Sequence, residues 1–123
     1  MNDIMVSIFC ITYNHGLYIR DAIEGFLMQK TNFKYEIIIH DDASEDNTAE
    51  IIKEYEQNYP GLIYGIYESH NQWGCHFPVL DWIIELQKQH CKGKYIASCE
   101  GDDYWIDMQK LQLQVDYMEN HTF

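Results

Sequence analysis

Four strand-like runs alternate with four helix-like segments along this chain, and this order constrains the fold more than any other feature. The strand-like runs are short and rich in β-branched and aromatic residues, and they span 6–11, 35–40, 62–67 and 95–99. The helix-like segments carry apolar residues at helical spacing, and they span 18–29, 48–59, 78–89 and 107–119. Such alternation predicts an α/β fold: a three-layer α/β/α sandwich with a mainly parallel sheet, in one domain over residues 1–123.

The run at 35–40 (YEIIIH) shows almost no alternation between apolar and polar positions, which indicates a strand covered by helices on both faces. In open parallel sheets, ligands bind beyond the carboxyl ends of the strands. Polar or aromatic side chains follow every predicted strand, and they are Thr12, Tyr13 and Asn14, then Asp41 and Asp42, then Glu68, Ser69 and Asn71, then Glu100, Asp102 and Asp103. We therefore expect these side chains to share one edge of the sheet.

Acidic side chains that crowd together raise one another's pKa unless a positive charge lies between them. Mg²⁺ or Mn²⁺ suits such oxygen ligands, and these ions are commonly held by one or two carboxylates together with substrate phosphates. Asp102 and Asp103 could supply these carboxylates, while Tyr13 could stack on a nucleobase and Asp41 or Asp42 could accept a base N–H or a ribose hydroxyl. The alternative for each acidic pair is an ordinary solvated turn or a helix cap.

The charge balance excludes several classes of partner. Acidic residues outnumber basic ones by 20 to 8, for a formal net charge of −12, so the chain repels nucleic-acid phosphates and anionic lipid. No apolar run approaches the roughly 18 residues that a membrane span needs. The first residues enter a strand-like run without a basic segment, so we expect no secretory signal.

The cysteines and histidines admit a zinc site as an alternative, but their spacing matches no standard zinc finger or ribbon. The residues concerned are His70, Cys75, His76, His90 and Cys91. Cys10 and Cys99 lie within strand-like runs, where a reduced and buried thiol is the simpler interpretation.

Three segments of the chain resemble one known family. They are VSIFCITYNHGLYIRDAIEGFLMQ, YEIIIHDDASEDNTAEII and GKYIASCEGDDYWIDMQKLQLQVDYME. They are similar to the inverting glycosyltransferases of family 2, which have the Rossmann-like GT-A fold of nucleotide-diphospho-sugar transferases. The most specific features are the Asp-Asp-x-Ser-x-Asp-x-Thr segment from Asp41 and the acidic turn from Glu100. The EGDDYW form of that turn resembles bacterial enzymes that build surface polysaccharides, and the likeness is weakest over 68–81.

The resemblance implies a hexosyltransferase that moves a sugar from a nucleotide-diphosphate donor, most commonly a UDP-sugar, to an acceptor hydroxyl with inversion. The implied acceptor is a saccharide or a lipid-linked saccharide, the implied cofactor is Mn²⁺ or Mg²⁺, and the implied location is cytoplasmic or peripheral at the inner face of a membrane. In such a site, Tyr13 would stack on the nucleobase, with Thr12 and Asn14 beside it. Asp42 would hold the base and Asp41 would support its turn.

The acidic turn matches the metal and sugar-nucleotide motif of the family. Asp103 would bind the metal, and Asp102 would bind the ribose or the sugar and contribute to the metal site. Glu100 stands where many members have Asp. The family commonly has basic residues after the third strand that contact the donor or its phosphates, but the stretch 60–80 holds no Lys or Arg. The metal would then neutralise more of the phosphate charge, or His70 and His76 would contribute to neutralising it.

The catalytic base of the family lies in the acceptor-binding half, so we expect it beyond Phe123 and assign no base within the chain. The chain is then expected to be the donor-binding part of a longer enzyme. Three other functions remain as alternatives. A sugar-nucleotide binding module without activity would use the same residues. A sugar-nucleotide nucleotidyltransferase would need a Gly-rich loop after the first strand, where only Gly16 is present. A receiver-like, Mg²⁺-binding signalling domain would need its acidic pair after the first strand.

Overall fold

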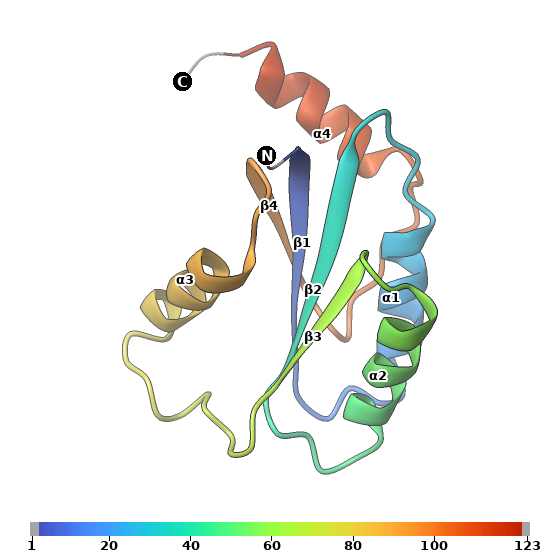
Figure 1. Cartoon of the computed structure of the whole chain (residues 1–123). Coiled ribbons are helices and arrows are strands. Elements are labelled where there is room, and N and C mark those ends of the chain that lie inside the picture. Colours follow the sequence, from blue (N-terminus) through green and yellow to red (C-terminus); the bar gives the residue numbers. More distant parts are fainter. Residues whose placement is uncertain (1–2, 122–123) are drawn as a thin grey trace.

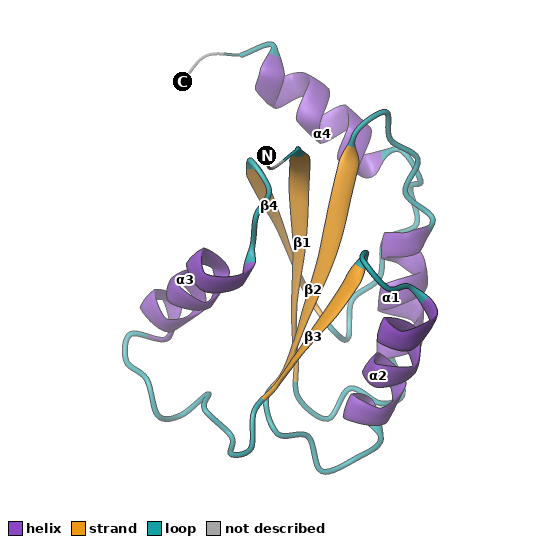
Figure 2. Cartoon of the chain, viewed as in Figure 1, coloured by secondary structure: helices purple, strands orange, loops and turns teal. Residues whose placement is uncertain are grey.

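A four-stranded, entirely parallel sheet forms the centre of the molecule, in the strand order β3-β2-β1-β4. The computed structural model describes residues 3–121, so residues 1–2 and 122–123 of the predicted domain lie outside the described part. Strands and helices alternate as the sequence predicts (Figures 1 and 2). The elements are β1 (Ile4–Thr12), α1 (Ile19–Leu27), β2 (Lys34–Asp41), α2 (Thr48–Asn58), β3 (Ile63–Tyr67), α3 (Val79–His90), β4 (Tyr95–Glu100) and α4 (Lys110–Glu119).

Helices cover both faces of the sheet, which confirms the three-layer prediction. Helices α1, α2 and α4 pack on one face, where Ile8, Ile37 and Ile39 belong to the main core (Figure 1). Helix α3 packs on the other face, where Phe9 and Ile38 meet Leu86. The apolar run of β2 is therefore buried on both sides, which explains why its sequence lacks alternation.

The junction between α1 and α4 differs from the sequence prediction. Helix α1 ends at Leu27 and α4 begins only at Lys110, because residues 107–109 form a turn. The buried side chain of Gln29 joins the segment after α1 to the start of α4. Its amide nitrogen donates to Asp107 O at 2.8 Å, and its amide oxygen accepts the N–H of Leu111 at 3.0 Å. Gln29 thus supplies a partner for a free N–H in the first turn of α4.

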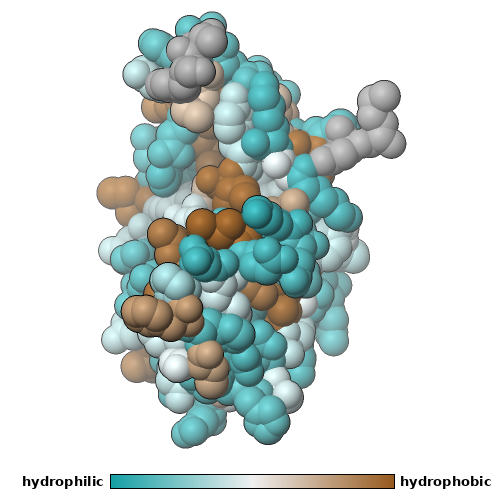
Figure 3. Space-filling model, turned by 90° about the vertical axis from the view of Figure 1, so that its left-hand side faces the viewer, coloured by the Kyte–Doolittle hydropathy of each residue, from teal (hydrophilic) through white to brown (hydrophobic). Residues whose placement is uncertain are grey.

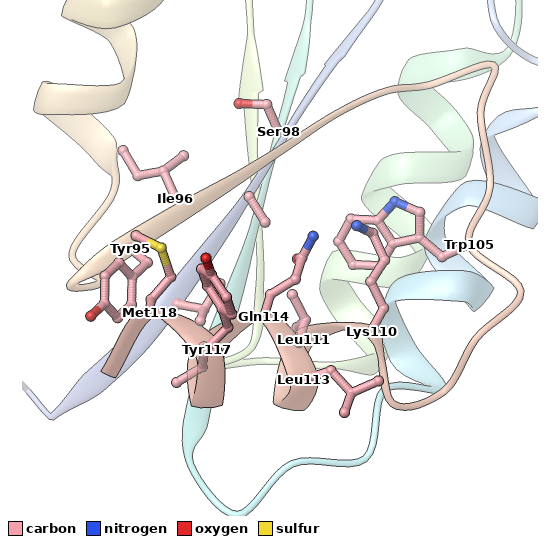
Figure 4. A pocket seen from close by; sticks show the side chains of 13 residues that line it. Tyr95, Ile96, Ser98, Trp105, Lys110, Leu111, Leu113, Gln114, Tyr117 and Met118 are labelled. Carbon is pink, nitrogen blue, oxygen red and sulfur yellow. The ribbon is translucent and has the colours of Figure 1, made fainter. Parts of the chain in front are cut away.

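Strand β4 lies at an edge of the sheet, and among the described residues it pairs only with β1. A groove of about 580 Å³ runs between β4 and α4, and we call it the β4–α4 groove (Figure 4). Hydrophobic side chains also gather on the side of the molecule where α3 lies (Figure 3). Leu80 and Ile84 of α3 and Ile96 of β4 are among the exposed apolar residues. Over residues 3–121, the helices are too short or too polar to cross a bilayer.

Candidate functional site

A cavity of about 310 Å³ opens at the edge of the sheet where the carboxyl ends of the strands lie. Its lining residues lie at the carboxyl ends of all four strands or in the loops that follow them, and they are Ile11, Thr12, Tyr13, His15, Asp42, Asn71, Trp73 and Glu100. The strand register explains this convergence, because Thr12 pairs with Asp41, Ile11 pairs with Glu100 and Asp41 pairs with Tyr67. The expectation that these segments meet at one edge is confirmed, and we call this region the carboxyl edge.

The loops after β1 and β2 hold each other at this edge. The N–H of Asn14 donates to Ser44 Oγ at 2.9 Å, and Asn14 Oδ1 accepts the N–H of Glu45 at 2.8 Å. Asn14 has a left-handed backbone with φ of 54°, which Asn tolerates better than most residues. The side chain predicted to lie beside the nucleotide therefore also joins the two loops.

Asp41 supports the turn after β2 from a buried position. One oxygen, Oδ1, accepts the hydroxyls of Ser44 and of Thr12, the latter at 3.4 Å. The other oxygen accepts the N–H of Ser44 at 3.2 Å. These bonds hold the turn around Ala43, whose φ is 59°. Thr12 Oγ1 also donates to His40 O at 3.0 Å, so Thr12 is buried and aligns the ends of β1 and β2.

Asp42 lines the cavity and organises the loop that follows β3. Its carboxylate accepts the N–H of Gln72 at 2.7 Å and the N–H of Trp73 at 3.0 Å. Its carbonyl oxygen accepts Asn71 Nδ2 at 3.1 Å. Only 1% of Asp42 is exposed, so the two N–H groups compensate for the cost of burying a carboxylate. Each carboxylate oxygen can accept more than one hydrogen bond, so Asp42 can still accept from a ligand in the cavity.

The acidic turn after β4 lies against the end of β1. The N–H of Gly101 donates to Ile11 O at 3.0 Å, and the N–H of Asp103 donates to Glu100 O at 3.1 Å. A Cβ on residue 101 would collide with the side chains of Thr12 and His15, so only glycine permits this approach. Asp102 Oδ2 lies 3.9 Å from His15 Nε2, and His15 lines the cavity.

The donor set of this turn suits a hard divalent cation. Asp102 and Asp103 are exposed carboxylates that follow the lining residue Glu100, but neither of them lines the cavity itself. No group of three or more His, Cys, Asp or Glu side chains that could hold a metal occurs within residues 3–121. Mg²⁺ and Mn²⁺ need no such cluster, because substrate phosphates and water complete their coordination. The residues present therefore fit a cation that arrives with a phosphorylated ligand.

The thiols give no support to the zinc alternative. All four cysteines are free. Burial raises the pKa of Cys91 to about 11, and burial followed by the charge of Asp103 raises the pKa of Cys99 to about 11. Burial also holds the pKa of Cys10 well above its usual range. Of these three cysteines only Cys91 belongs to the zinc alternative, and within residues 3–121 no three or more His, Cys, Asp or Glu side chains gather in a way that could hold a metal.

Some cavity residues were not predicted from the sequence as binding residues. His15 and Trp73 line the cavity, whereas His70 and His76, which were expected to help with charge, are not among its lining residues. His76 stacks on Trp82 of α3 instead, with 5.2 Å between the ring centroids. The position of His15 and Trp73 in the loops after β1 and β3 was the available signal, but the path of each loop decides which side chains reach the cavity.

A family model described as "Glycosyl transferase family 2" matches residues 7–76. The Mycobacterium tuberculosis protein Rv1520 is 45% identical over 94% of this chain, which corresponds to 32% of that protein. A Bacillus subtilis protein named putative teichuronic acid biosynthesis glycosyltransferase TuaG is 29% identical over 93% of this chain and 42% of its own length. The chain thus spans about a third to two fifths of the length of these relatives.

Two solved structures are similar to the fold. S. aureus TarS 1-349 in complex with UDP superposes with a TM-score of 0.76 and 21% identity, over 96% of this chain and 33% of TarS. The mannosyltransferase PcManGT from Pyrobaculum calidifontis, in complex with GDP-Man and Mn²⁺, superposes with a TM-score of 0.77 and 18% identity, over 99% of this chain and 34% of its own. At these identities the likeness concerns the fold.

Proposed function

The chain belongs to glycosyl transferase family 2 and has the GT-A fold, and from this premise we propose that it is the donor-binding domain of a longer glycosyltransferase. The donor is a nucleotide-diphosphate sugar, for which a UDP-sugar is our first choice. The observation that carries the proposal is the single cavity that Tyr13, Asp42 and Glu100 share at the carboxyl edge. Ligand sites typically combine a mainly apolar lining with a few convergent polar groups, as this cavity does.

In this proposal the nucleobase lies against Tyr13, whose ring is 40% exposed and lines the cavity. The buried carboxylate of Asp42 accepts an N–H of the base, and uracil offers one such N–H. Thr12 and Asn14 keep the surrounding loops in place through the hydrogen bonds described above. Asp41 acts in the same way from the turn after β2.

Asp102 and Asp103 are proposed to hold Mn²⁺ or Mg²⁺ at the acidic turn, with Asp102 also contacting the ribose or the sugar. When it is bound, the cation supplies neutralisation of the charge that develops on the departing diphosphate. His15 lines the cavity and its Nε2 lies 3.9 Å from Asp102 Oδ2, so its imidazole is placed to contact a phosphate group beside the acidic turn. The exposed carboxylates and the tight turn support this assignment.

The proposed transfer inverts the anomeric carbon, because an acceptor hydroxyl attacks from the face opposite the diphosphate. The base that deprotonates this hydroxyl is assigned to no residue of the chain and is expected in the acceptor-binding part of the longer enzyme. Hexosyl transfer to a saccharide or lipid-linked saccharide of the bacterial surface is our proposal for the acceptor, and the likeness to TuaG supports it. A cytoplasmic location, with or without peripheral attachment to a membrane, belongs to the same proposal.

Thermal unfolding of the chain with Mn²⁺ and a nucleotide panel tests this function. We expect UDP together with Mn²⁺ to raise the melting temperature by more than the sum of their separate effects, because both stabilise the same folded site. Asp103→Ala is expected to remove this synergy. Glu85→Ala is the matched control, because it removes the same charge from an exposed position on α3, away from the cavity.

Other outcomes would contradict the proposal. No stabilisation by any nucleotide, with or without Mn²⁺, would exclude a donor site. Stabilisation by acetyl phosphate and Mg²⁺ without any effect of nucleotides would instead support the receiver-like alternative. Loss of synergy in the control variant as well would remove the assignment of Asp103 as a ligand.

A further inference from the structure

We propose that Trp73 forms a second aromatic wall of the nucleobase site, in addition to Tyr13. Tyr13 belongs to the loop after β1, whereas Trp73 belongs to the loop after β3 and is held in place by Asp42 and Trp82. This inference rests on the proposed function, because it adds a contact to the same nucleotide. Trp73 lies on the loop between β3 and α3, a region that the family resemblance covers least. The side chain is 50% exposed and lines the same cavity as Tyr13.

The composition of the cavity suits a flat heteroaromatic ring. Tyr13 and Trp73 offer two aromatic faces, and both rings are partly exposed to the cavity and to solvent. Asp42 offers a carboxylate and Asn71 offers an amide, and these groups can bond to the polar edge of a base. A nucleobase presents this combination of an apolar face and a polar edge, and it stacks well on aromatic side chains.

The main chain of the loop is fixed to the end of β2. The N–H groups of Gln72 and Trp73 both donate to the carboxylate of Asp42, at 2.7 and 3.0 Å. Asn71 Nδ2 donates to the carbonyl oxygen of the same residue at 3.1 Å. The acidic residue that is proposed to bind the base therefore also sets the position of the loop that carries Trp73.

The indole ring has a second support from α3. The rings of Trp73 and Trp82 meet edge to face, with 6.2 Å between centroids. Trp82 is itself placed between His76, which stacks on it, and the buried ring of His40, whose centroid lies 5.5 Å away. His40 is bonded through Nε2 to Glu68 at 3.1 Å. This ring array holds Trp73 while half of its surface stays exposed, which a purely structural packing role does not require.

The expected effect is on the affinity for bases rather than for phosphates. Every base has an aromatic face, so loss of one stacking wall weakens the binding of different nucleotides to a similar degree. We expect Trp73→Ala to raise the Kd for UDP, in the presence of Mn²⁺, by about tenfold. Trp73→Phe is expected to restore most of the affinity. Binding of inorganic diphosphate with Mn²⁺ should not change in either variant.

Isothermal titration calorimetry and tryptophan fluorescence together test this inference. The chain has three tryptophans, and we expect UDP to quench the fluorescence of the half-exposed Trp73. In Trp73→Phe, which retains a ring, UDP should still bind while this quenching disappears. Tyr117→Ala is the control, because it removes an exposed aromatic ring from the β4–α4 groove and should leave both signals unchanged.

The result that would overturn the inference is an unchanged Kd for UDP in a folded Trp73→Ala variant. Full quenching by UDP in Trp73→Phe would overturn it as well, even if the alanine variant did not fold. In both cases the wild-type chain still binds UDP, so the proposed function would stand. Absence of UDP binding by the wild-type chain would instead reject the proposed function, and this inference with it.

Discussion

The carboxyl edge and the β4–α4 groove are built in opposite ways. The groove is larger, at about 580 Å³ against about 310 Å³ for the cavity, and it is bordered by apolar and amphipathic side chains such as Leu113, Tyr117 and Met118. The cavity at the carboxyl edge is smaller, but the loops around it are joined by hydrogen bonds to buried carboxylates. The cavity that we propose as the donor site is thus the smaller of the two hollows, and its convergent polar groups rather than its size support that choice.

The two regions should also respond differently to substitution. The carboxyl edge depends on hydrogen bonds to the buried carboxylates of Asp41 and Asp42, so variants of these bonds should lose both stability and nucleotide binding. The core beside the β4–α4 groove depends on apolar packing, so its variants should lose stability alone. Four predictions test this contrast, from the largest expected effect to the smallest.

Asp42→Ala should have the largest effect of these. It removes two charge-assisted hydrogen bonds, from the partly buried N–H groups of Gln72 and Trp73, which costs roughly 2–6 kcal/mol in the free energy of unfolding. It should also abolish measurable binding of UDP. Urea unfolding and calorimetry measure the two effects, and Asp42→Asn, which keeps one oxygen acceptor, should lose less of each. Retention of full UDP affinity by the alanine variant would contradict both the base contact and the loop support.

Leu111→Ala should lower the free energy of unfolding by about 2–5 kcal/mol, because Leu111 is buried in the main core beside the β4–α4 groove. The Kd for UDP of the folded fraction should stay within about twofold of the wild-type value. Leu113→Ala is the control, because Leu113 is 57% exposed on the same helix and its loss should cost little. A large change in Kd with Leu111→Ala would show that the two regions are coupled.

Gly101→Ala should cost about 1–3 kcal/mol, because the added Cβ meets the side chains of Thr12 and His15 and forces the acidic turn away from β1. The Mn²⁺-dependent part of UDP binding should weaken as well. Gly74→Ala is a matched control, since a Cβ at that position meets nothing within 4 Å. Equal effects of the two substitutions on the melting temperature would contradict the close approach of the turn.

The smallest expected effect concerns how the contribution of Asp46 to the free energy of unfolding depends on pH. Although burial raises its pKa, hydrogen bonds from the hydroxyl and N–H of Thr48 and from the N–H of Gly16 bring that pKa below its ordinary value of 3.8. Because the folded-state pKa is the lower one, this stabilisation is present above about pH 4 and disappears as the pH falls through the folded-state pKa. Solvent screening at this exposed site keeps it below about 1 kcal/mol.

Urea unfolding between pH 6 and pH 3 measures this contribution. The difference in stability between the wild-type chain and Asp46→Asn should shrink at the acidic end of the range. Gln57→Ala, an exposed change on α2 that removes no titratable group, is the control. A difference for Asp46→Asn that grows on acidification would contradict the direction of the pKa shift.

The sequence was sufficient to predict the strands, helices and parallel sheet, because apolar periodicity is a local property of each segment. It was also sufficient to predict that Tyr13, Asp42 and Glu100 lie at one edge of the sheet, since that follows from the parallel topology alone. The start of α4 was predicted three residues too early, at Asp107 instead of Lys110. The cause is a tertiary contact, because Gln29 lies 78 residues before the turn to which it bonds.

The loop after β3 limited what could be predicted of the site. Its Asn, Gly and aromatic residues indicate irregular structure but do not determine its direction. That direction depends on two backbone N–H groups reaching Asp42 and on rings packing against α3. From the sequence, Trp73 could therefore not be distinguished from the other ring-bearing residues of this loop, such as His70 and His76.

The bonds of Gln29 have a consequence for how the acidic pair can move. Gly101 is bonded to β1, and six residues later Asp107 is bonded to Gln29, just past the end of α1, with Met108 O accepting the N–H of Lys30 at 2.8 Å. The segment 102–106 is short and is hydrogen-bonded to the rest of the protein at both ends, so Asp102 and Asp103 can move only over short distances. Any adjustment to a ligand must then come from backbone torsions within residues 102–106. Amide hydrogen exchange of these residues should therefore slow when the ligand binds.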